Sequence, residues 1–228
     1  MNLLDRLDGE SGREYAYRIL KNNIMSLELK PGENISETIL AQQLNISRTP
    51  IREVLMKLKE EHLIEVKPQI GTYVSLIDKN LIEEAFFMRY YLEIEVMKLA
   101  CKDFPKDKLS ELEKCLISQK YISGKTECEI DFHKLDVQFH NIIFSGVKRS
   151  EVWKGILRIS THYDRLRLIA ETKYSNESTI KQHEKFIETI KNKDIKSVEA
   201  LVTKHLKEPK KGWDEIFNKD FEYKSYFK

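Results

Sequence analysis

The chain has 228 residues, of which 41% are hydrophobic and 33% charged, so it is long enough to bury one or two hydrophobic cores. Its eight glycines and five prolines exclude collagenous and low-complexity proteins, and no stretch approaches the roughly 20 consecutive apolar residues that a membrane-spanning helix needs. The 39 basic and 37 acidic side chains leave a net charge of +2, so the whole chain carries no electrostatic signature of a nucleic-acid-binding protein.

The start of the chain and its cysteines bear on where the protein works. Residues 2–8 are short and acidic where a secretory signal would be basic and then apolar. The three cysteines are an odd number and lack C-x-x-C spacing, which argues against a disulfide framework and a thiolate zinc site. We therefore expect a cytoplasmic protein with free thiols and no membrane partner.

Glycine and proline divide the chain unevenly and predict two domains. Before about residue 78, turn-forming residues recur at short intervals, whereas long helical periods follow. We expect one domain over residues 1–78 and a second over residues 79–228.

In the first domain, the spacing of apolar residues predicts three short helices. The first covers about four turns and ends before Pro31 and Gly32. Ser36 is the expected N-cap of the second helix, and Asn45 is expected to end it in the left-handed conformation. The third begins at Ser47, and its apolar stripe consists of Ile51, Val54, Leu55 and Leu58.

Two short strands are expected after the third helix. Residues 63–66 and 72–74 favour strands and flank a turn that carries Gly71. Three helices followed by a hairpin form a winged helix-turn-helix, which we predict for residues 1–78.

The start of the third helix carries side chains suited to DNA, because the second helix of a helix-turn-helix enters the major groove with its N-terminal residues. Arg48 and Arg52 lie four residues apart on one helix face, where a guanidinium can bind guanine or a phosphate. Ser47 and Thr49 are short donors suited to phosphate oxygens. Gly71 would let the wing backbone approach the minor groove closely.

The charge of this domain does not by itself favour DNA. Residues 1–78 carry ten basic and twelve acidic side chains, a net charge of −2. Residues 47–59 carry four basic side chains against one acidic, so the positive charge gathers where the groove would be. Solvated arginines at a helix start remain the alternative to DNA contacts.

This segment resembles the DNA-binding domain of GntR-superfamily transcription regulators. The likeness covers roughly residues 11–75 and is carried by residues 29–37, 40–41 and 45–55, and then by Leu58 and residues 61–64 and 71–74. Its most specific part is the motif Ser-Arg-Thr-Pro-x-Arg-Glu.

The GntR resemblance implies a winged helix in which DNA is touched by Ser47, Arg48, Thr49, Arg52 and Gly71. Thr38 is a departure, because many relatives carry a base-reading arginine at this position. Thr38 is therefore a candidate DNA contact, but the operator sequence of relatives does not carry over.

The residues after 79 contain no comparable strand pattern. Apolar residues at three- and four-residue spacing predict six helices, over residues 81–102, 106–122, 129–144, 151–172, 178–192 and 195–207. Six such helices form a bundle, so the expected fold class is mainly α. Residues 209–228 are rich in aromatic side chains, and we expect this segment to pack on the bundle or on a second subunit.

Four polar side chains on inward-facing helix positions indicate a metal site. Asp136 and His140 lie four residues apart and share a helix face, and His183 and His205 likewise interrupt apolar stripes. Imidazole and carboxylate groups together bind divalent transition metals. The alternative for each histidine is a hydrogen-bonded core residue.

The order Asp-x-x-x-His, His, His is similar to that of the FCD domain, the FadR-like C-terminal module of the same superfamily. This resemblance implies one divalent transition metal per chain, zinc before nickel or manganese, held by Asp136, His140, His183 and His205. In that family the metal and an arginine receive the carboxylate of a small organic acid. The arginine corresponds to Arg89, whose alternative role is an ion pair with Glu93 one turn further on.

Four more polar side chains are candidates for the surroundings of this site. His133 shares a helix face with Asp136 and is expected to support the ligands. His162, Arg165 and Arg167 are candidates for lining the same cavity.

Together with the resemblance to GntR and FCD proteins, these patterns lead us to expect a homodimeric, metabolite-responsive transcription regulator without enzyme activity. Two winged helices would bind a pseudo-palindromic double-stranded operator, and a small carboxylate effector would change their relative placement. One alternative is a metal-dependent enzyme acting on a small organic acid, because three histidines and an aspartate can activate water. Another is a metal-stabilised dimeric DNA-binding protein without an effector.

Overall fold

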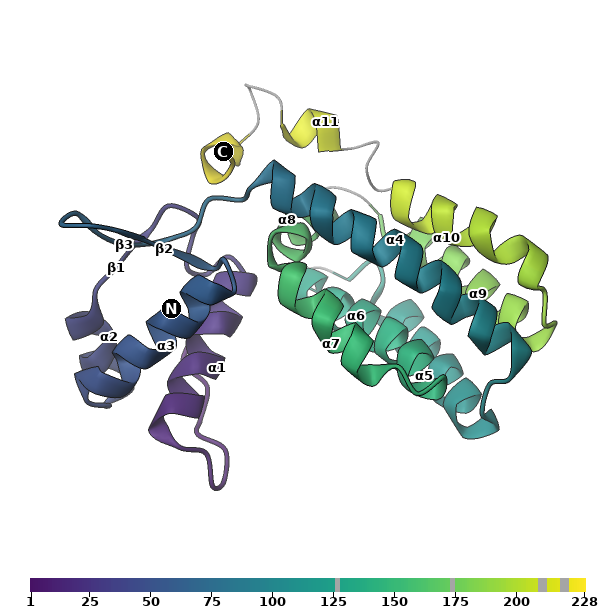
Figure 1. The fold of residues 1–228 in the computed structure, drawn as a ribbon, viewed down its shortest axis with the longest axis horizontal. Coiled ribbons are helices and arrows are strands. Elements are labelled where there is room, and N and C mark those ends of the chain that lie inside the picture. Colours follow the sequence, from purple (N-terminus) through teal and green to yellow (C-terminus); the bar gives the residue numbers. More distant parts are fainter. Residues whose placement is uncertain (126–127, 173–174, 209–212, 218–221) are drawn as a thin grey trace. The chain divides into compact units, whose positions relative to one another are not determined.

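The structure is a computed structural model that describes residues 1–125, 128–172, 175–208, 213–217 and 222–228 (Figure 1). The chain divides into two compact units. The first consists of Met1–Ile82, Thr161–Leu166 and Phe217–Lys228, and the second of Glu83–Ser160 and Arg167–Ile216.

Three helices form most of the first unit, as the sequence predicts. They are α1 (Gly12–Met25), α2 (Glu37–Leu44) and α3 (Arg48–Glu60). The Ser36 hydroxyl caps α2 by accepting a hydrogen bond from the Ile39 N–H at 3.4 Å. Asn45 ends α2 with φ 52° and ψ 49°, the expected left-handed conformation.

The core of this unit lies between the three helices and a small sheet. All four residues of the predicted stripe on α3 are buried, and they pack with α1 side chains such as Ile19, Leu20 and Ile24. Burying these side chains together is what holds three short helices in place, since helices of this length are marginal alone.

The sheet has three antiparallel strands in the order β1-β3-β2. The predicted hairpin is β2 (Ile64–Lys67) and β3 (Gly71–Val74), with Glu65 opposite Tyr73. The sequence analysis missed β1 (Asn34–Ile35), which pairs with the other edge of β3. A strand of two residues shows no alternation of apolar and polar side chains, so no pattern could indicate it.

The end of the chain also belongs to the first unit. The Ile77 N–H donates to the carbonyl of Tyr226 at 2.7 Å, and the Lys228 N–H donates to the carbonyl of Ile77 at 3.1 Å. The Phe217 and Phe227 rings meet edge to face at 5.1 Å. Part of the aromatic segment expected to pack, including Phe221, lies outside the described residues.

The second unit is a bundle of helices. Its main elements are α4 (Lys79–Lys102), α5 (Lys106–Ile122), α6 (Glu129–Gly146), α7 (Ser150–Ile159), α8 (Thr161–Glu171), α9 (Glu177–Lys191) and α10 (Val198–Lys207). The first turn of α4 and the Thr161–Leu166 part of α8 belong to the first unit. The 3₁₀ turn η1 (Ile195–Ser197) leads into α10, the short α11 (Trp213–Ile216) follows it, and η3 (Lys224–Tyr226) lies near the chain end. The mainly α fold, with an N-terminal winged helix and a helical second part, is confirmed.

One predicted helix of the bundle is wrong. Residues 151–172 form two helices, because Ser160 leaves the helical conformation with ψ near 4° and separates α7 from α8. Apolar residues continue at helical spacing on both sides of Ser160, so the spacing of apolar residues gives no sign of the break between the two helices.

The sequence predicts free cysteine thiols and no membrane-spanning helix. None of the described helices combines the length and apolar character needed to cross a lipid bilayer. The three cysteines are all free thiols, and Cys101 and Cys115 are buried.

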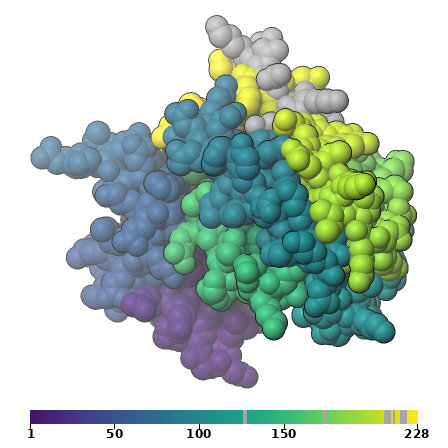
Figure 2. All heavy atoms as spheres, turned by 45° about the vertical axis from the view of Figure 1, so that its right-hand side comes forward, coloured from purple at the N-terminus to yellow at the C-terminus, as the bar shows by residue number. Residues whose placement is uncertain are grey.

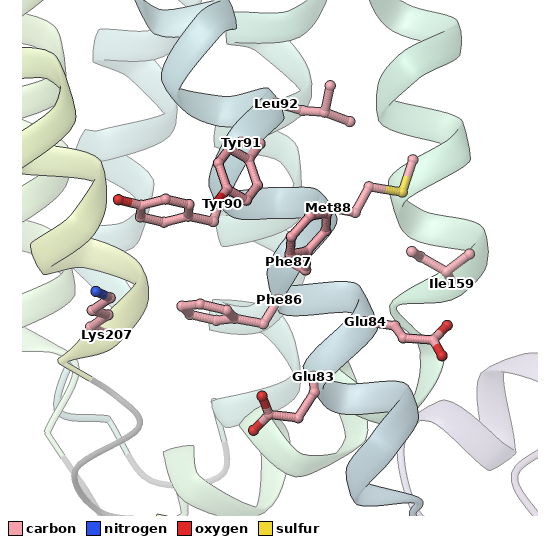
Figure 3. A pocket seen from close by; sticks show the side chains of 10 residues that line it. All are labelled: Glu83, Glu84, Phe86, Phe87, Met88, Tyr90, Tyr91, Leu92, Ile159 and Lys207. Carbon is pink, nitrogen blue, oxygen red and sulfur yellow. The ribbon is translucent and has the colours of Figure 1, made fainter.

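In the second unit, α4 lies beside α10 (Figures 1 and 2). An open groove follows α4, and Figure 3 shows the side chains that line it. The groove has a volume of about 1060 Å³ and is lined mainly by α4 side chains, with Ile159 from α7 and Lys207 from α10. Phe87 and Tyr91 are 65% and 54% exposed, and their rings meet at 4.7 Å. The second unit therefore presents an aromatic surface to its surroundings.

Candidate metal centre and DNA-binding surface

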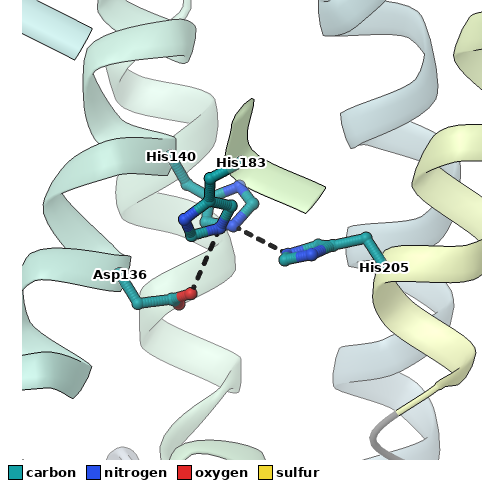
Figure 4. Close-up of side chains that lie close together, drawn as sticks. All are labelled: Asp136, His140, His183 and His205. Carbon is teal, nitrogen blue, oxygen red and sulfur yellow. Dashed lines mark hydrogen bonds and ion pairs between the residues drawn. The ribbon is translucent and has the colours of Figure 1, made fainter. Parts of the chain in front are cut away.

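Four side chains meet inside the second unit at the positions expected for a metal site (Figure 4). Helix α6 supplies Asp136 and His140, α9 supplies His183, and α10 supplies His205. One ligand atom from each lies within 4.8 Å of the others, and no side chain of the four is more than 5% exposed. The fold thus brings the four predicted residues to one point.

Aromatic packing fixes the orientation of the imidazole rings. The Phe139 ring stacks on the His183 ring with centroids 4.0 Å apart and planes 10° apart. Trp153 lies 5.7 Å from His140, and Phe186 lies 5.1 Å from His205. Because these aromatic side chains are buried, the rings have little freedom to turn away.

Each histidine directs its Nε2 atom toward the centre of the cluster. The Nε2 atoms of His140 and His205 lie 3.2 Å apart, and Nε2 of His183 lies 3.5 Å from Oδ1 of Asp136. The three Nδ1 atoms face outward to side-chain acceptors. Gln119 lies 2.8 Å from Nδ1 of His183 and Gln182 lies 2.8 Å from Nδ1 of His205, both at hydrogen-bond distance. Glu93 lies 3.2 Å from Nδ1 of His140 as an ion-pair contact.

The charge state of the cluster suits metal ligands. Burial alone would raise the pKa of Asp136, but the Arg167 guanidinium, with its Nη1 donating to Oδ2 at 2.6 Å, holds that pKa well below its usual value. Burial lowers the pKa of His183 to about 3 and also lowers that of His205. At neutral pH the cluster therefore offers an ionised Asp136 carboxylate and neutral His183 and His205 imidazoles, the forms that coordinate metals.

Two buried atoms of the cluster show that the residues fit a metal ion. Oδ1 of Asp136 and Nε2 of His183 have no hydrogen-bond partner among the described residues. Buried polar atoms are normally paired, and a divalent cation would satisfy both. Three imidazole nitrogens and one carboxylate oxygen are ligands that zinc and its neighbours accept, so this group could hold a metal.

Arg89 lies on α4 and is 3% exposed. Its Nε donates to Oε1 of Glu93 at 2.6 Å, and its guanidinium carbon lies 5.7 Å from the Trp153 ring centre. Burial would raise the pKa of Glu93, but Arg89 and then His140 hold it below its usual value. The ion pair weighed from the sequence thus exists, and it connects Arg89 to the cluster through Glu93.

The sequence analysis missed three residues that surround the cluster: Glu93 as a contact of His140, and Gln119 and Gln182. Their signal is weak but present, since each is a buried polar side chain on a helix that otherwise turns apolar residues inward. Glutamines in this position are also common as plain core hydrogen-bonding residues, so spacing alone could not single them out.

The four side chains expected around the site have different environments. Arg167 contacts Asp136 directly, and His133 lies 3.6 Å from Glu171, which is itself bound to Arg167 at 3.2 Å. His162 and Arg165 belong to the first unit. There the Nη1 of Arg165 donates to the carbonyl of Ser75 at 2.8 Å, and Nε2 of His162 lies 2.9 Å from the carbonyl of His62.

The DNA-binding candidates lie on the surface of the first unit. Ser47, Arg48 and Thr49 are exposed at the start of α3, and Thr38 is exposed on α2. Ser47 is the N-cap residue of α3, yet its hydroxyl makes no capping hydrogen bond. That hydroxyl is thus not used for capping, and an exposed helix N-terminus with free polar side chains suits a phosphate.

Arg52 is held by an acidic neighbour. Its Nη2 and Nε donate to the two carboxylate oxygens of Glu37 on α2, at 3.1 and 3.3 Å, while its side chain stays 67% exposed. Among the described residues, Arg48 makes no ion pair. The two arginines of the motif thus differ in how firmly the free protein orients them.

Gly71 opens β3 at the end of the wing turn, where its φ is +150°. A Cβ atom there would come within 3.0 Å of the Nδ2 of Asn34. The positive φ therefore favours glycine, and the end of the Asn34 side chain would have to shift to admit a larger residue.

Two family models cover most of the chain. Residues 13–74 match the family described as bacterial regulatory proteins, gntR family, and residues 84–208 match the FCD domain. The chain belongs to the GntR family and carries an FCD domain. This confirms the resemblance seen in the sequence.

Known GntR-family proteins support the assignment over most of their length. The HTH-type transcriptional repressor RspR of Escherichia coli strain K12 is 30% identical over 193 residues, 84% of each chain. The gluconate operon transcriptional repressor of Bacillus subtilis strain 168 is 29% identical over 190 residues, 81% of this chain and 77% of its own. This GntR-family protein is therefore a transcription regulator.

A solved structure shows the same fold. Escherichia coli McbR/YncC has a TM-score of 0.75 with 20% sequence identity, and the match covers 92% of this chain and 100% of that one. The two proteins thus share their overall fold.

Proposed function

We propose that this GntR-family regulator binds a pseudo-palindromic operator as a homodimer and responds to a small carboxylate effector. Residues 1–78 would bind DNA, and residues 79–228 would hold one divalent metal, the effector and the dimer contacts. The observation that carries the proposal is the buried group of Asp136, His140, His183 and His205, with Arg89 connected to it through Glu93.

DNA binding would rest on the exposed start of α3. Arg48 and Arg52 would bind base edges or phosphates, Ser47 and Thr49 would bind phosphates, and Thr38 and Gly71 would complete the surface. Because a two-fold dimer presents two equal helices, the operator would be an inverted repeat.

The experiment is to recover and sequence genomic fragments bound by the full-length protein at moderate salt. An inverted repeat should be enriched by the wild type and lost in the Arg48→Ala/Arg52→Ala double variant. Each base-reading arginine should contribute about 1–3 kcal/mol to operator binding. Equal enrichment by a folded double variant would refute the assigned roles of the two arginines.

The metal would be held by Asp136, His140, His183 and His205. When bound, it would supply a positive charge that attracts a carboxylate in a site closed to bulk water. Zinc is expected first, with nickel or manganese as alternatives, because the ligands are mostly imidazole nitrogens.

Metal content and thermal unfolding test this part. The purified protein should contain about one metal per chain, and chelation should lower its melting temperature. A metal present at about 100 times its Kd stabilises the folded state by about 2.7 kcal/mol. His183→Ala should lose the metal and the response to chelation, and full retention of metal by this variant would exclude His183 as a ligand.

The effector would be recognised through its carboxylate, which Arg89 can bind by two parallel hydrogen bonds. Binding would shift the protein between two arrangements of its reading helices by differential affinity for them. Titration with small carboxylic acids, each compared with its uncharged amide, tests this. The acid should change operator affinity and the amide should not; stable metal binding without any response to acids would favour the effector-free alternative.

The dimer would use the aromatic surface of α4. Phe87 and Tyr91 are large, exposed and adjacent, and exposed apolar patches on soluble proteins commonly mark interfaces. The groove beside them, lined by Met88 and Ile159, could accept side chains of a second copy. Its charged residues, Glu83, Glu84 and Lys207, include both signs, so a second copy could place Lys207 against an acidic side chain.

A further inference from the structure

We infer that Gln119, Gln182 and Glu93 are positioning residues that keep hydrogen on Nδ1 of the three cluster histidines and leave Nε2 open toward the centre. The inference deepens the proposed metal site and rests on it. Each of these three residues acts through the atom, a hydrogen-bond donor or an acceptor, that faces Nδ1 of its histidine. The other hydrogen bonds of the residue determine that orientation.

The orientation of Gln119 is fixed by the backbone of α6. Its Nε2 group donates to the carbonyl of Leu135 at 3.1 Å, so its Oε1 faces Nδ1 of His183 at 2.8 Å. A carbonyl oxygen can only accept, and therefore Nδ1 of His183 must carry the hydrogen. Gln119 is fully buried, so no exposed water can replace it.

Gln182 is oriented by different neighbours with the same result. Its Nε2 group donates to the carboxylate of Glu208 and to the hydroxyl of Ser178 at 3.2 Å. The reverse orientation would place the amide oxygen against that carboxylate, which is unfavourable. Oε1 of Gln182 therefore faces Nδ1 of His205 at 2.8 Å, and that nitrogen carries the hydrogen.

Glu93 acts on the third histidine. Arg89 binds its Oε1 at 2.6 Å and favours the ionised carboxylate, which has no hydrogen to donate. Oε2 lies 3.2 Å from Nδ1 of His140 as an ion-pair contact, so a hydrogen on Nδ1 of this imidazole would face the carboxylate.

The three outer residues together leave lone pairs facing one another. With hydrogens on Nδ1, neither His140 nor His205 can donate across the 3.2 Å between their Nε2 atoms. Nε2 of His183 likewise faces the carboxylate oxygen of Asp136 at 3.5 Å without a hydrogen between them. A cation at the centre would remove both repulsions, so the outer residues prepare the site for coordination through Nε2.

Nitrogen NMR on the full-length protein labelled with ¹⁵N-histidine tests the tautomers directly, and chelator competition with Zn²⁺ tests their consequence. The near-isosteric variants Gln119→Met and Gln182→Met remove one acceptor each. Gln138→Met, an exposed residue on α6, is the matched control. Circular dichroism and thermal unfolding establish that each variant is folded.

The metal-free wild type should show Nδ1–H on His183 and His205. Each methionine variant should convert its own histidine partly to Nε2–H and bind Zn²⁺ about 10- to 100-fold more weakly, with the control unchanged. Nε2–H in the wild type overturns the inference. So does Zn²⁺ affinity within about twofold of the wild type in both folded variants.

The same measurements separate this inference from the proposed metal site. A wild type that binds no Zn²⁺, Ni²⁺ or Mn²⁺ refutes the metal site itself. The tautomers of the metal-free protein then still decide the positioning role, because Nδ1–H supports it and Nε2–H overturns it.

Discussion

Arg167 on α8 donates from Nη1 to Oδ2 of Asp136 at 2.6 Å, so the carboxylate of the candidate metal cluster is already paired with a cation supplied by the protein. Both side chains are buried, at 8% and 1% exposure. The other oxygen of Asp136 points into the cluster. One carboxylate is thus shared between a permanent cation and the position a metal would take.

This sharing predicts how Arg167→Met should behave. Removing one partner of a buried ion pair destabilises a protein by about 3–5 kcal/mol, because the other charge is left unpaired. Bound Zn²⁺ should reduce the loss, since the metal gives Asp136 another cation. Urea unfolding with and without Zn²⁺ measures both values, and Arg158→Met on the exposed face of α7 is the control. An equal loss in both conditions would contradict the shared carboxylate.

His162 predicts a pH dependence of stability. Burial first, and the Arg165 guanidinium second, lower the pKa of His162 from 6.5 to about 3. Between these values the unfolded chain binds a proton that the folded chain does not. Stability should therefore fall as the pH is lowered through this range, by about 1.4 kcal/mol per pH unit for one proton.

The variant His162→Gln isolates this contribution. Other buried histidines, such as His183, also lower stability in acid, but they are present in both proteins. The difference in free energy of unfolding between wild type and variant, measured by urea titration from about pH 7 to pH 4, should change with pH. A constant difference across that range would show that His162 does not titrate in this way.

Glu37→Gln should weaken the discrimination of operator from random DNA. The substitution removes the ion pair, leaves Arg52 at most one of its two acceptors at this position, and removes a negative charge beside α3. Binding to random DNA should strengthen, while operator selectivity falls by about fivefold or less, as expected for an exposed pair. Dissociation constants for both DNAs at one salt concentration give the ratio.

Glu60→Gln is the control for charge alone, because Glu60 is an exposed residue at the other end of α3. It should strengthen binding to both DNAs without changing their ratio. If the two variants behave alike, Glu37 contributes charge and has no orienting role.

The aromatic surface of α4 predicts the effect of a Phe87→Ser/Tyr91→Ser double variant. Losing two exposed aromatic anchors should raise the dimer dissociation constant by at least about 100-fold, since interface hot spots contribute about 2 kcal/mol or more each. Sedimentation velocity over a concentration series measures it. Ile117→Ser/Tyr121→Ser, an exposed apolar pair on α5, is the control, and loss of the dimer in that pair alone would reject the α4 surface.

Much of the first unit could be predicted from the sequence because its signals are local. The Ser36 cap, the left-handed Asn45 and the apolar stripe of α3 each depend on residues within about one turn. The break at Ser160 and the two-residue strand β1 could not be predicted, because neither changes the periodicity of the residues around it.

The candidate metal cluster likewise depends partly on local sequence spacing and partly on tertiary packing. Asp136 and His140 share a helix face at four-residue spacing, which the sequence alone determines, and the inward positions of His183 and His205 follow from the stripes beside them. Only the tertiary structure decided that these three helices bring the four side chains within 4.8 Å of one another.

The sequence likewise could not show which of the nearby polar residues contact the cluster. Arg165 and Arg167 are two positions apart, about 200° around the helix, so they point in different directions and bind Ser75 and Asp136 respectively. Which of them reaches the cluster depends on how α8 packs. The contact of Gln119 with His183 likewise depends on how α5 packs against α9. Local spacing determines which face a side chain occupies, but the packing of elements distant in sequence determines what that face meets.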